Sequence, residues 1–155
     1  MPPLPDGYRT TSDPDRIDVD VVHAFLARSY WAAGIPRQVV ERSVRNSLCV
    51  ALLDPADRLV GFARAVTDRA TFAYLCDVFV LEEHRGRGLG HHVVDTLLAH
   101  PDLQGLRRLN LVTRDAHALY ARKGFRAVAH PDRYMERLDP DVYKRLAEAG
   151  DSPRP

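Results

Sequence analysis

Three consecutive apolar runs constrain the fold of this chain more than any other feature. They are SLCVALLD (47–54), RLVGFARAVTD (58–68) and TFAYLCDVFVL (71–81), and short turn-like segments such as DPAD connect them. Runs of this length, rich in β-branched and aromatic residues and bounded by turn residues, are typical of consecutive antiparallel strands. We therefore expect a three-stranded meander at the centre of the fold.

Helical patterns flank these runs and set the fold class. Residues 16–31 and 34–47 place apolar side chains at helical spacing, the first behind Asp18 or Asp20 as N-cap. Two helices, a meander and then strand–helix units predict an α+β (mixed α/β) layer protein. We expect a single domain over 7–149 between flexible ends at 1–6 and 150–155. The remaining expected elements are an edge strand from Tyr8, helices at 88–100, 115–125 and 139–150, and strands at 106–113, 126–130 and 134–138.

Composition excludes several functional classes. The net charge of +1 offers no broad field for nucleic acid or an anionic membrane. The opening MPPLPDGYRTT lacks the basic and apolar regions of a signal peptide, and no apolar run approaches membrane-spanning length. We therefore expect a cytoplasmic protein with neither a nucleic-acid nor a membrane partner. Cys49 and Cys76 lie inside apolar runs and are expected to be reduced core residues.

The segment HRGRGLGHH (84–92) joins the third run to a helix. A helix N-terminus exposes N–H groups with partial positive charge, and glycines let a phosphate approach that backbone closely. A tight turn with solvated arginines explains the pattern equally well. Neither common nucleotide fingerprint fits, because no Lys-Ser/Thr pair follows the last glycine and three meander strands precede Gly86-x-Gly88-x-Gly90.

Two motifs together resemble the GNAT superfamily of acetyl-CoA-dependent N-acetyltransferases. Arg85-x-x-Gly88-x-Gly90 is similar to the family's Arg/Gln-x-x-Gly-x-Gly/Ala motif between a strand and a helix. DAHALYARKGF (115–125) resembles its second motif, a helix with Ala-x-x-Leu-Tyr before Gly-Phe. The order and separation match, and the corresponding elements cover nearly the whole chain. The resemblance implies a central, mostly antiparallel sheet that is flanked by helices and splayed at the acetyl-CoA site.

By this resemblance, acetyl-CoA lies on the turn and along the strand before it. The pyrophosphate binds the N–H groups of the turn, and the pantetheine arm pairs with the strand backbone as an added extended chain. Asp115 stands where many members have a pantetheine-binding asparagine, and it can instead cap the helix at Ala116. The expected cofactor-binding residues are Val78, Phe79, Val80, Arg85, Gly86, Arg87, Gly88, Leu89, Gly90 and Asp115.

The implied reaction is direct transfer of the acetyl group from the thioester to a neutral amine. Tyr120 matches the family's general acid for the departing thiolate, with a core tyrosine as the alternative. Asp77 is an acid inside an apolar run, where an unpaired charge is costly, and strand alternation puts it on the face of Phe79 and Leu81. It is the base acting through water, a ligand for a cationic acceptor, or the partner in a structural hydrogen bond.

The acceptor is a small-molecule or peptide amine that the sequence does not identify. In this family the connection between the first two helices helps to build the acceptor pocket, which makes Tyr30 and Trp31 candidate pocket residues, with core packing as the alternative. HPDRYMERL (130–138) resembles a segment of many uncharacterised bacterial members. A homodimer is expected by analogy with relatives alone. No metal is expected, because adjacent His91 and His92 point to different helix faces.

Two rival functions accompany the enzyme hypothesis. One is a non-catalytic acyl-CoA-binding sensor or scaffold, which keeps the phosphate turn but lacks a usable acceptor pocket. The other is a binder of a different nucleotide that reuses the turn. Tyr120 and the second motif favour the enzyme over both rivals.

Overall fold

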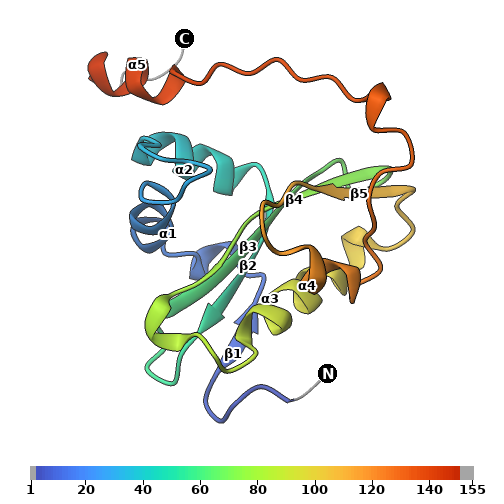
Figure 1. The fold of residues 1–155 in the computed structure, drawn as a ribbon. Helices are drawn as coiled ribbons and strands as arrows, with labels where there is room; N and C mark the ends of the chain where they lie inside the picture. Colours follow the sequence, from blue (N-terminus) through green and yellow to red (C-terminus); the bar gives the residue numbers. More distant parts are fainter. Residues whose placement is uncertain (1–2, 151–155) are drawn as a thin grey trace. The chain divides into compact units, whose positions relative to one another are not determined.

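The computed structural model describes residues 3–150, and the chain divides into two compact units, Met1–Val112 and Thr113–Pro155. The first unit holds the sheet and the helices α1 to α3, and the second holds α4 and α5 (Figure 1). The expectation of one domain over 7–149 stays a prediction.

The first unit is built on a five-stranded sheet with the spatial order β1-β2-β3-β4-β5. The first four strands are antiparallel neighbours, and β5 runs parallel to β4 after a crossover through α3. The predicted meander is therefore confirmed, as is the α+β class with a mostly antiparallel sheet. The strands are β1 (Arg9–Thr11), β2 (Leu48–Leu53), β3 (Leu59–Thr67), β4 (Phe72–Val80) and β5 (Arg108–Leu111).

Local sequence signals account for the starts of the helices in this unit. In α1 (Val19–Leu26), the Asp18 carboxylate accepts hydrogen bonds from the N–H groups of Asp20 and Val21, so Asp18 is the N-cap. Pro36 precedes α2 (Arg37–Arg45) with an extended backbone, and Gly88 precedes α3 (Leu89–Leu98) with a left-handed one. Among residues 3–150, no helix is long and apolar enough to cross a bilayer.

Helices cover both faces of the sheet. On β4, Phe79 stacks on Phe25 of α1 with ring centroids 4.0 Å apart. The neighbouring residue Val80 points to the other face, where its methyl group lies near Gly90 of α3. The sheet is thus a central layer between α1 on one side and α3 on the other (Figure 1).

Strands β4 and β5 pair over only part of their length. Their register runs from Phe72 opposite Arg108 to Leu75 opposite Leu111. Pairing of β4 with β3 continues to Val80, but it is interrupted by a bulge near Asp77, whose φ is +54°. In the described part of the chain, β4 beyond Leu75 therefore lacks a β5 partner, and Cys76, Phe79 and Val80 keep a partner in β3 alone.

The second unit differs from the predicted pattern. It contains α4 (His117–Ala121) and α5 (Val142–Glu148), as expected, but residues 126–130 and 134–138 lack the predicted strand structure although both lie within the described range. Met135 is 97% exposed, so this apolar side chain is not held against a sheet. Strand propensity needs a partner edge to become a strand, and this unit, as described, contains none.

Candidate functional site

The glycine turn at residues 85–90, called the glycine cradle below, has an open backbone. Gly86 and Gly88 have φ values of +80° and +74°, so both use the left-handed conformation that glycine adopts without strain. An ideal Cβ on either residue would meet no described atom within 4 Å, which leaves their backbone accessible. Within residues 3–150, no side chain caps the N-terminus of the ten-residue helix α3. Uncapped N–H groups at a glycine turn are suited to binding a phosphate.

Side chains brace this cradle from the same unit. The Arg85 Nε donates a hydrogen bond to the carbonyl oxygen of Val80 at 2.9 Å. The Arg87 Nη1 donates to the Tyr8 hydroxyl at 3.1 Å, and that hydroxyl lies 2.7 Å from the His84 Nδ1. Tyr8 was expected only to begin an edge strand, so this link between the N-terminal segment and the cradle was missed.

The bulge in β4 brings Asp77 into a hydrogen-bonded ion pair. Its Oδ2 accepts from the Arg64 Nε at 2.8 Å, and its Oδ1 accepts from the Trp31 indole Nε1 at 2.9 Å. The Asp77 side chain is 9% exposed and the Arg64 side chain 16%. Of the three alternatives for Asp77, a hydrogen bond to a neighbouring loop is therefore present, joined by an arginine that the sequence had not indicated.

Arg64 is the centre of this cluster. Its Nη1 donates to the Ser47 Oγ at 3.0 Å. Burial lowers the pKa of the guanidinium, but the charge and hydrogen bond of Asp77 more than offset this, so the net pKa is raised. Cys49 and Cys76 lie directly across from Arg64 in the ladders, and burial raises the pKa of both thiols to about 12. The cluster is thus one cation and one anion flanked by neutral thiols.

The bulge also changes which β4 side chains share a face. Arg64 pairs with Cys76 and Phe62 pairs with Phe79, so Cys76 and Phe79 lie on the same face. Strict alternation would separate them. Asp77 reaches this face as predicted, because its carboxylate contacts Arg64.

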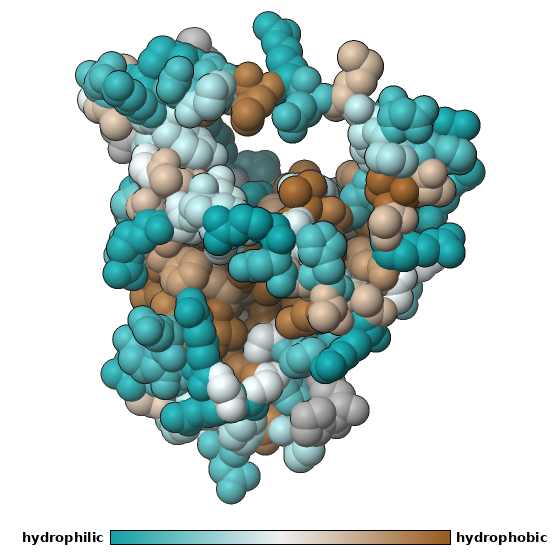
Figure 2. Space-filling view, viewed as in Figure 1, coloured by the Kyte–Doolittle hydropathy of each residue, from teal (hydrophilic) through white to brown (hydrophobic). Residues whose placement is uncertain are grey.

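Tyr30 and Trp31 are surface residues at the end of α1. Their side chains are 53% and 41% exposed, so the alternative of core packing is wrong. The two rings meet edge to face at 5.1 Å, and Phe25 contacts Trp31 at 6.1 Å. In Figure 2, apolar surface gathers over the strands of this unit beside α1. The two exposed rings and the Asp77 carboxylate lie together, because the Trp31 indole donates to that carboxylate.

The second unit carries Tyr120 and Asp115. Tyr120 is 9% exposed, its ring meets Phe125 edge to face at 5.8 Å, and its carbonyl oxygen accepts the Phe125 N–H at 3.1 Å. Gly124, with φ +91°, reverses the chain as the predicted helix stop. The expected cap at Asp115 is wrong: α4 begins after Ala116, whose N–H is taken by the Thr113 hydroxyl.

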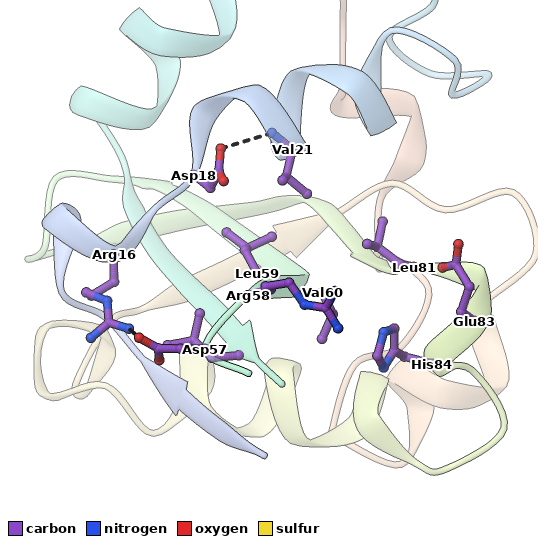
Figure 3. A pocket seen from close by; sticks show the side chains of 11 residues that line it. Arg16, Asp18, Val21, Asp57, Arg58, Leu59, Val60, Leu81, Glu83 and His84 are labelled. Carbon is purple, nitrogen blue, oxygen red and sulfur yellow. Dashed lines mark hydrogen bonds and ion pairs between the residues drawn. The ribbon is translucent and has the colours of Figure 1, made fainter. Parts of the chain in front are cut away.

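A pocket of about 620 Å³ in the first unit adjoins the start of the glycine turn, because Leu81, Glu83 and His84 help to line it (Figure 3). Apolar residues of β3 line it together with charged residues from η1 (Pro14–Arg16), the β2–β3 turn and η2 (Glu82–His84). Two ion pairs lie in its lining, Arg16 with Asp57 and Arg58 with the buried Asp54. Glu83 and His84 add further polar groups to the lining. The described residues also include no group of three or more potential metal ligands.

Comparisons with known proteins agree with this geometry. The family model described as Acetyltransferase (GNAT) family matches residues 16–125. A Gibberella zeae protein assigned as an acetyltransferase is 31% identical over 137 residues, covering 74% of this chain and 76% of that protein. A crystal structure of a Xanthomonas campestris protein assigned to the same family is 47% identical, with a TM-score of 0.84 over 88% of this chain and 96% of that one.

A Clostridium acetobutylicum protein, described as a predicted acetyltransferase with acetyl-CoA, shares the fold. Its TM-score is 0.61 at 15% identity, over 91% of this chain and 96% of that one. Both bacterial and fungal proteins are therefore among those similar to this chain. The extent of the family match and the identity to the two closer relatives named above establish the assignment. The chain belongs to the GNAT acetyltransferase family and is an acyltransferase.

Proposed function

We propose that this protein transfers the acetyl group of acetyl-CoA directly to a primary amine. One observation carries the proposal: the open glycine cradle directly follows a strand that loses its β5 partner after Leu75. An anion site and a free strand edge in succession suit a ligand that has a pyrophosphate and an extended amide arm.

The residues present fit acetyl-CoA. The N–H groups from Gly86 to Gly90 would hold the pyrophosphate, since the Arg85 N–H already donates to the Glu82 carbonyl oxygen at 3.1 Å. The backbone of Val78, Phe79 and Val80 would pair with the pantetheine arm. Two of these strand residues already have other partners, because Phe79 packs on Phe25 and the Val80 carbonyl accepts from Arg85. Neither contact is in conflict with the role, since side-chain packing leaves the backbone available and a carbonyl oxygen has two lone pairs. Asp115 would accept a hydrogen bond from the arm.

We assign the proton transfers to two residues. Tyr120 is the general acid for the leaving thiolate, because a phenol hydroxyl can donate a proton at neutral pH. Asp77 takes up the proton of the amine through water. Two hydrogen bonds occupy its oxygens, and a carboxylate has about four acceptor sites, so it can still accept from a water.

The acceptor would approach beside Tyr30 and Trp31. These exposed rings offer flat apolar surface next to the Asp77 carboxylate, so we infer a small-molecule or peptide amine as acceptor. A homodimer is proposed by analogy with the family alone.

A melting experiment with acetyl-CoA tests the proposal, with ATP and NAD as controls. A ligand that binds only the folded state, at about 100 times its dissociation constant, adds about 2.7 kcal/mol. For a chain of this size this corresponds to a rise in Tm of about 5–11 °C. A rise specific to acetyl-CoA is expected, followed by release of free CoA with at least one member of a panel of primary amines.

The other outcomes separate the rival functions. A rise with acetyl-CoA but no turnover with any amine would favour the non-catalytic sensor or scaffold. A larger rise with ATP or NAD would favour a different nucleotide. No rise with any of the three ligands would refute the phosphate cradle.

A further inference from the structure

Arg64 links three segments of the first unit that lie far apart in the sequence. It contacts Ser47, which follows α2, and Asp77, in the bulge of β4. Through Asp77 it is joined to Trp31, which follows α1. The chemistry proposed above gives Arg64 no role.

Three observations favour a positioning role for Arg64. Each oxygen of the Asp77 carboxylate accepts from a different donor, which fixes the rotation of the group. The Asp77 backbone is left-handed, so the bulge itself aims the side chain at Arg64. Cys49, Cys76 and Tyr74 are the other titratable groups around the pair, and burial raises the pKa of each. Arg64 is thus the cation that faces Asp77.

The position of the network follows from the cofactor arrangement proposed above, on which this inference rests. The pyrophosphate would lie beyond Val80, and the arm would then run back along Val80, Phe79 and Val78. The next residue in that direction is Asp77. The acetyl end of the cofactor would therefore arrive at the ion pair.

We infer that Arg64 is a positioning residue, which holds the Asp77 carboxylate in one orientation and thereby couples Trp31 to the acetyl end of the cofactor. Removal of the guanidinium frees the carboxylate to rotate and loosens its bond to the indole. The inference assigns specific consequences to a residue that does not itself touch the substrate.

The chain has one tryptophan, so the indole N–H of Trp31 gives a single, assignable resonance in an ¹⁵N-labelled sample. This resonance reports on the hydrogen bond between Trp31 and Asp77 in the ligand-free protein, so the experiment does not require a known acceptor. Arg64→Met removes the charge while keeping an unbranched side chain, and Arg64→Lys restores a cation. Arg45→Met is the matched control, because Arg45 is 67% exposed and lies 3.9 Å from Glu41. Melting curves verify that each variant is folded.

In the wild-type protein we expect acetyl-CoA to move the indole resonance more than CoA does. Arg64→Met should shift the resonance of the ligand-free protein and abolish the difference between acetyl-CoA and CoA, while retaining the rise in Tm with acetyl-CoA. Arg64→Lys should recover part of the difference, and Arg45→Met should match the wild type. The inference is overturned if Arg64→Met matches the wild type both in the ligand-free indole resonance and in the difference between acetyl-CoA and CoA. It is also overturned if the indole resonance of the wild-type protein does not distinguish acetyl-CoA from CoA. Absence of any rise in wild-type Tm with acetyl-CoA would refute the proposed function instead, and the ligand-free spectrum would still show whether Arg64 holds the network.

Discussion

Replacing Asp77 by asparagine isolates the energetics of the buried ion pair. Asparagine has nearly the same shape and also tolerates the left-handed backbone, so the φ of +54° adds little strain. The new amide nitrogen is a donor, and it must face either the Arg64 N–H or the Trp31 N–H, which are donors as well. The substitution therefore breaks one hydrogen bond and leaves a guanidinium that is 16% exposed without its counter-charge.

We expect Asp77→Asn to lower the free energy of unfolding by about 3 kcal/mol. This is the lower end of the range for breaking a buried ion pair, because Arg64 retains some contact with solvent. This corresponds to a fall in Tm of about 6–12 °C for a chain of this size. The control is Asp102→Asn, which breaks the exposed pair with Arg69, where the side chains are 40% and 50% exposed. An exposed pair contributes about 0–1 kcal/mol, so the control should lose less than about 4 °C.

A double variant completes the test of this reasoning. Asp77→Asn combined with Arg64→Met has no orphaned cation, so it should melt at a higher temperature than Asp77→Asn alone. Thermal melts of the four proteins in the cycle, followed by circular dichroism, give the coupling free energy. If the free energy of unfolding lost by the double variant equals the sum of the losses in the two single variants, the pair has no coupling and the reasoning is refuted.

Three further predictions concern the cradle, the acid and the thiols. Gly88→Ala and Gly105→Ala impose the same left-handed strain, since both glycines have φ +74°, so the two variants should lose a similar amount of stability. Only Gly88→Ala should also weaken acetyl-CoA binding, by at least about tenfold in Kd as measured by calorimetry. Tyr120→Phe should reduce turnover of an amine found in the panel by about 10²–10³-fold with acetyl-CoA affinity nearly unchanged, and full turnover would exclude it as the acid. Because burial raises the pKa of Cys49 and Cys76 to about 12, both should resist iodoacetamide at pH 8 until urea unfolds the protein; rapid labelling of the folded protein would contradict this.

Features set by neighbouring residues were predictable from the sequence. The Asp18 cap, the start of α3 after Gly88 and the three-stranded meander each depend on a local pattern or on adjacent turns. The same holds for the two motifs that identified the family. Residues 126–130 have a comparable strand-like pattern, but a strand also requires a partner edge, which a local pattern does not specify.

The ion pair was not predictable because it depends on register. Arg64 and Asp77 are the single charged residues inside the neighbouring strands β3 and β4, which was the one available signal that they meet. Whether they meet depends on a bulge that shifts β4 by one residue, and nothing in DVFV marks that shift. The exposure of Tyr30 and Trp31 was equally hidden, because aromatic residues after a helix are as suited to a core as to a surface.

The parting of β4 from β5 has a consequence for how this enzyme can diverge. A ligand arm that is read by main-chain N–H and C=O groups is recognised by atoms that every residue except proline supplies in full. Val78, Phe79 and Val80 can therefore be exchanged for other apolar residues to suit the core without altering the contacts offered to the cofactor. The proposed cofactor site thus places little constraint on side-chain identity along this edge. On the proposed arrangement, selection for a new acceptor can act on the loop that carries Trp31 while the cofactor edge drifts independently.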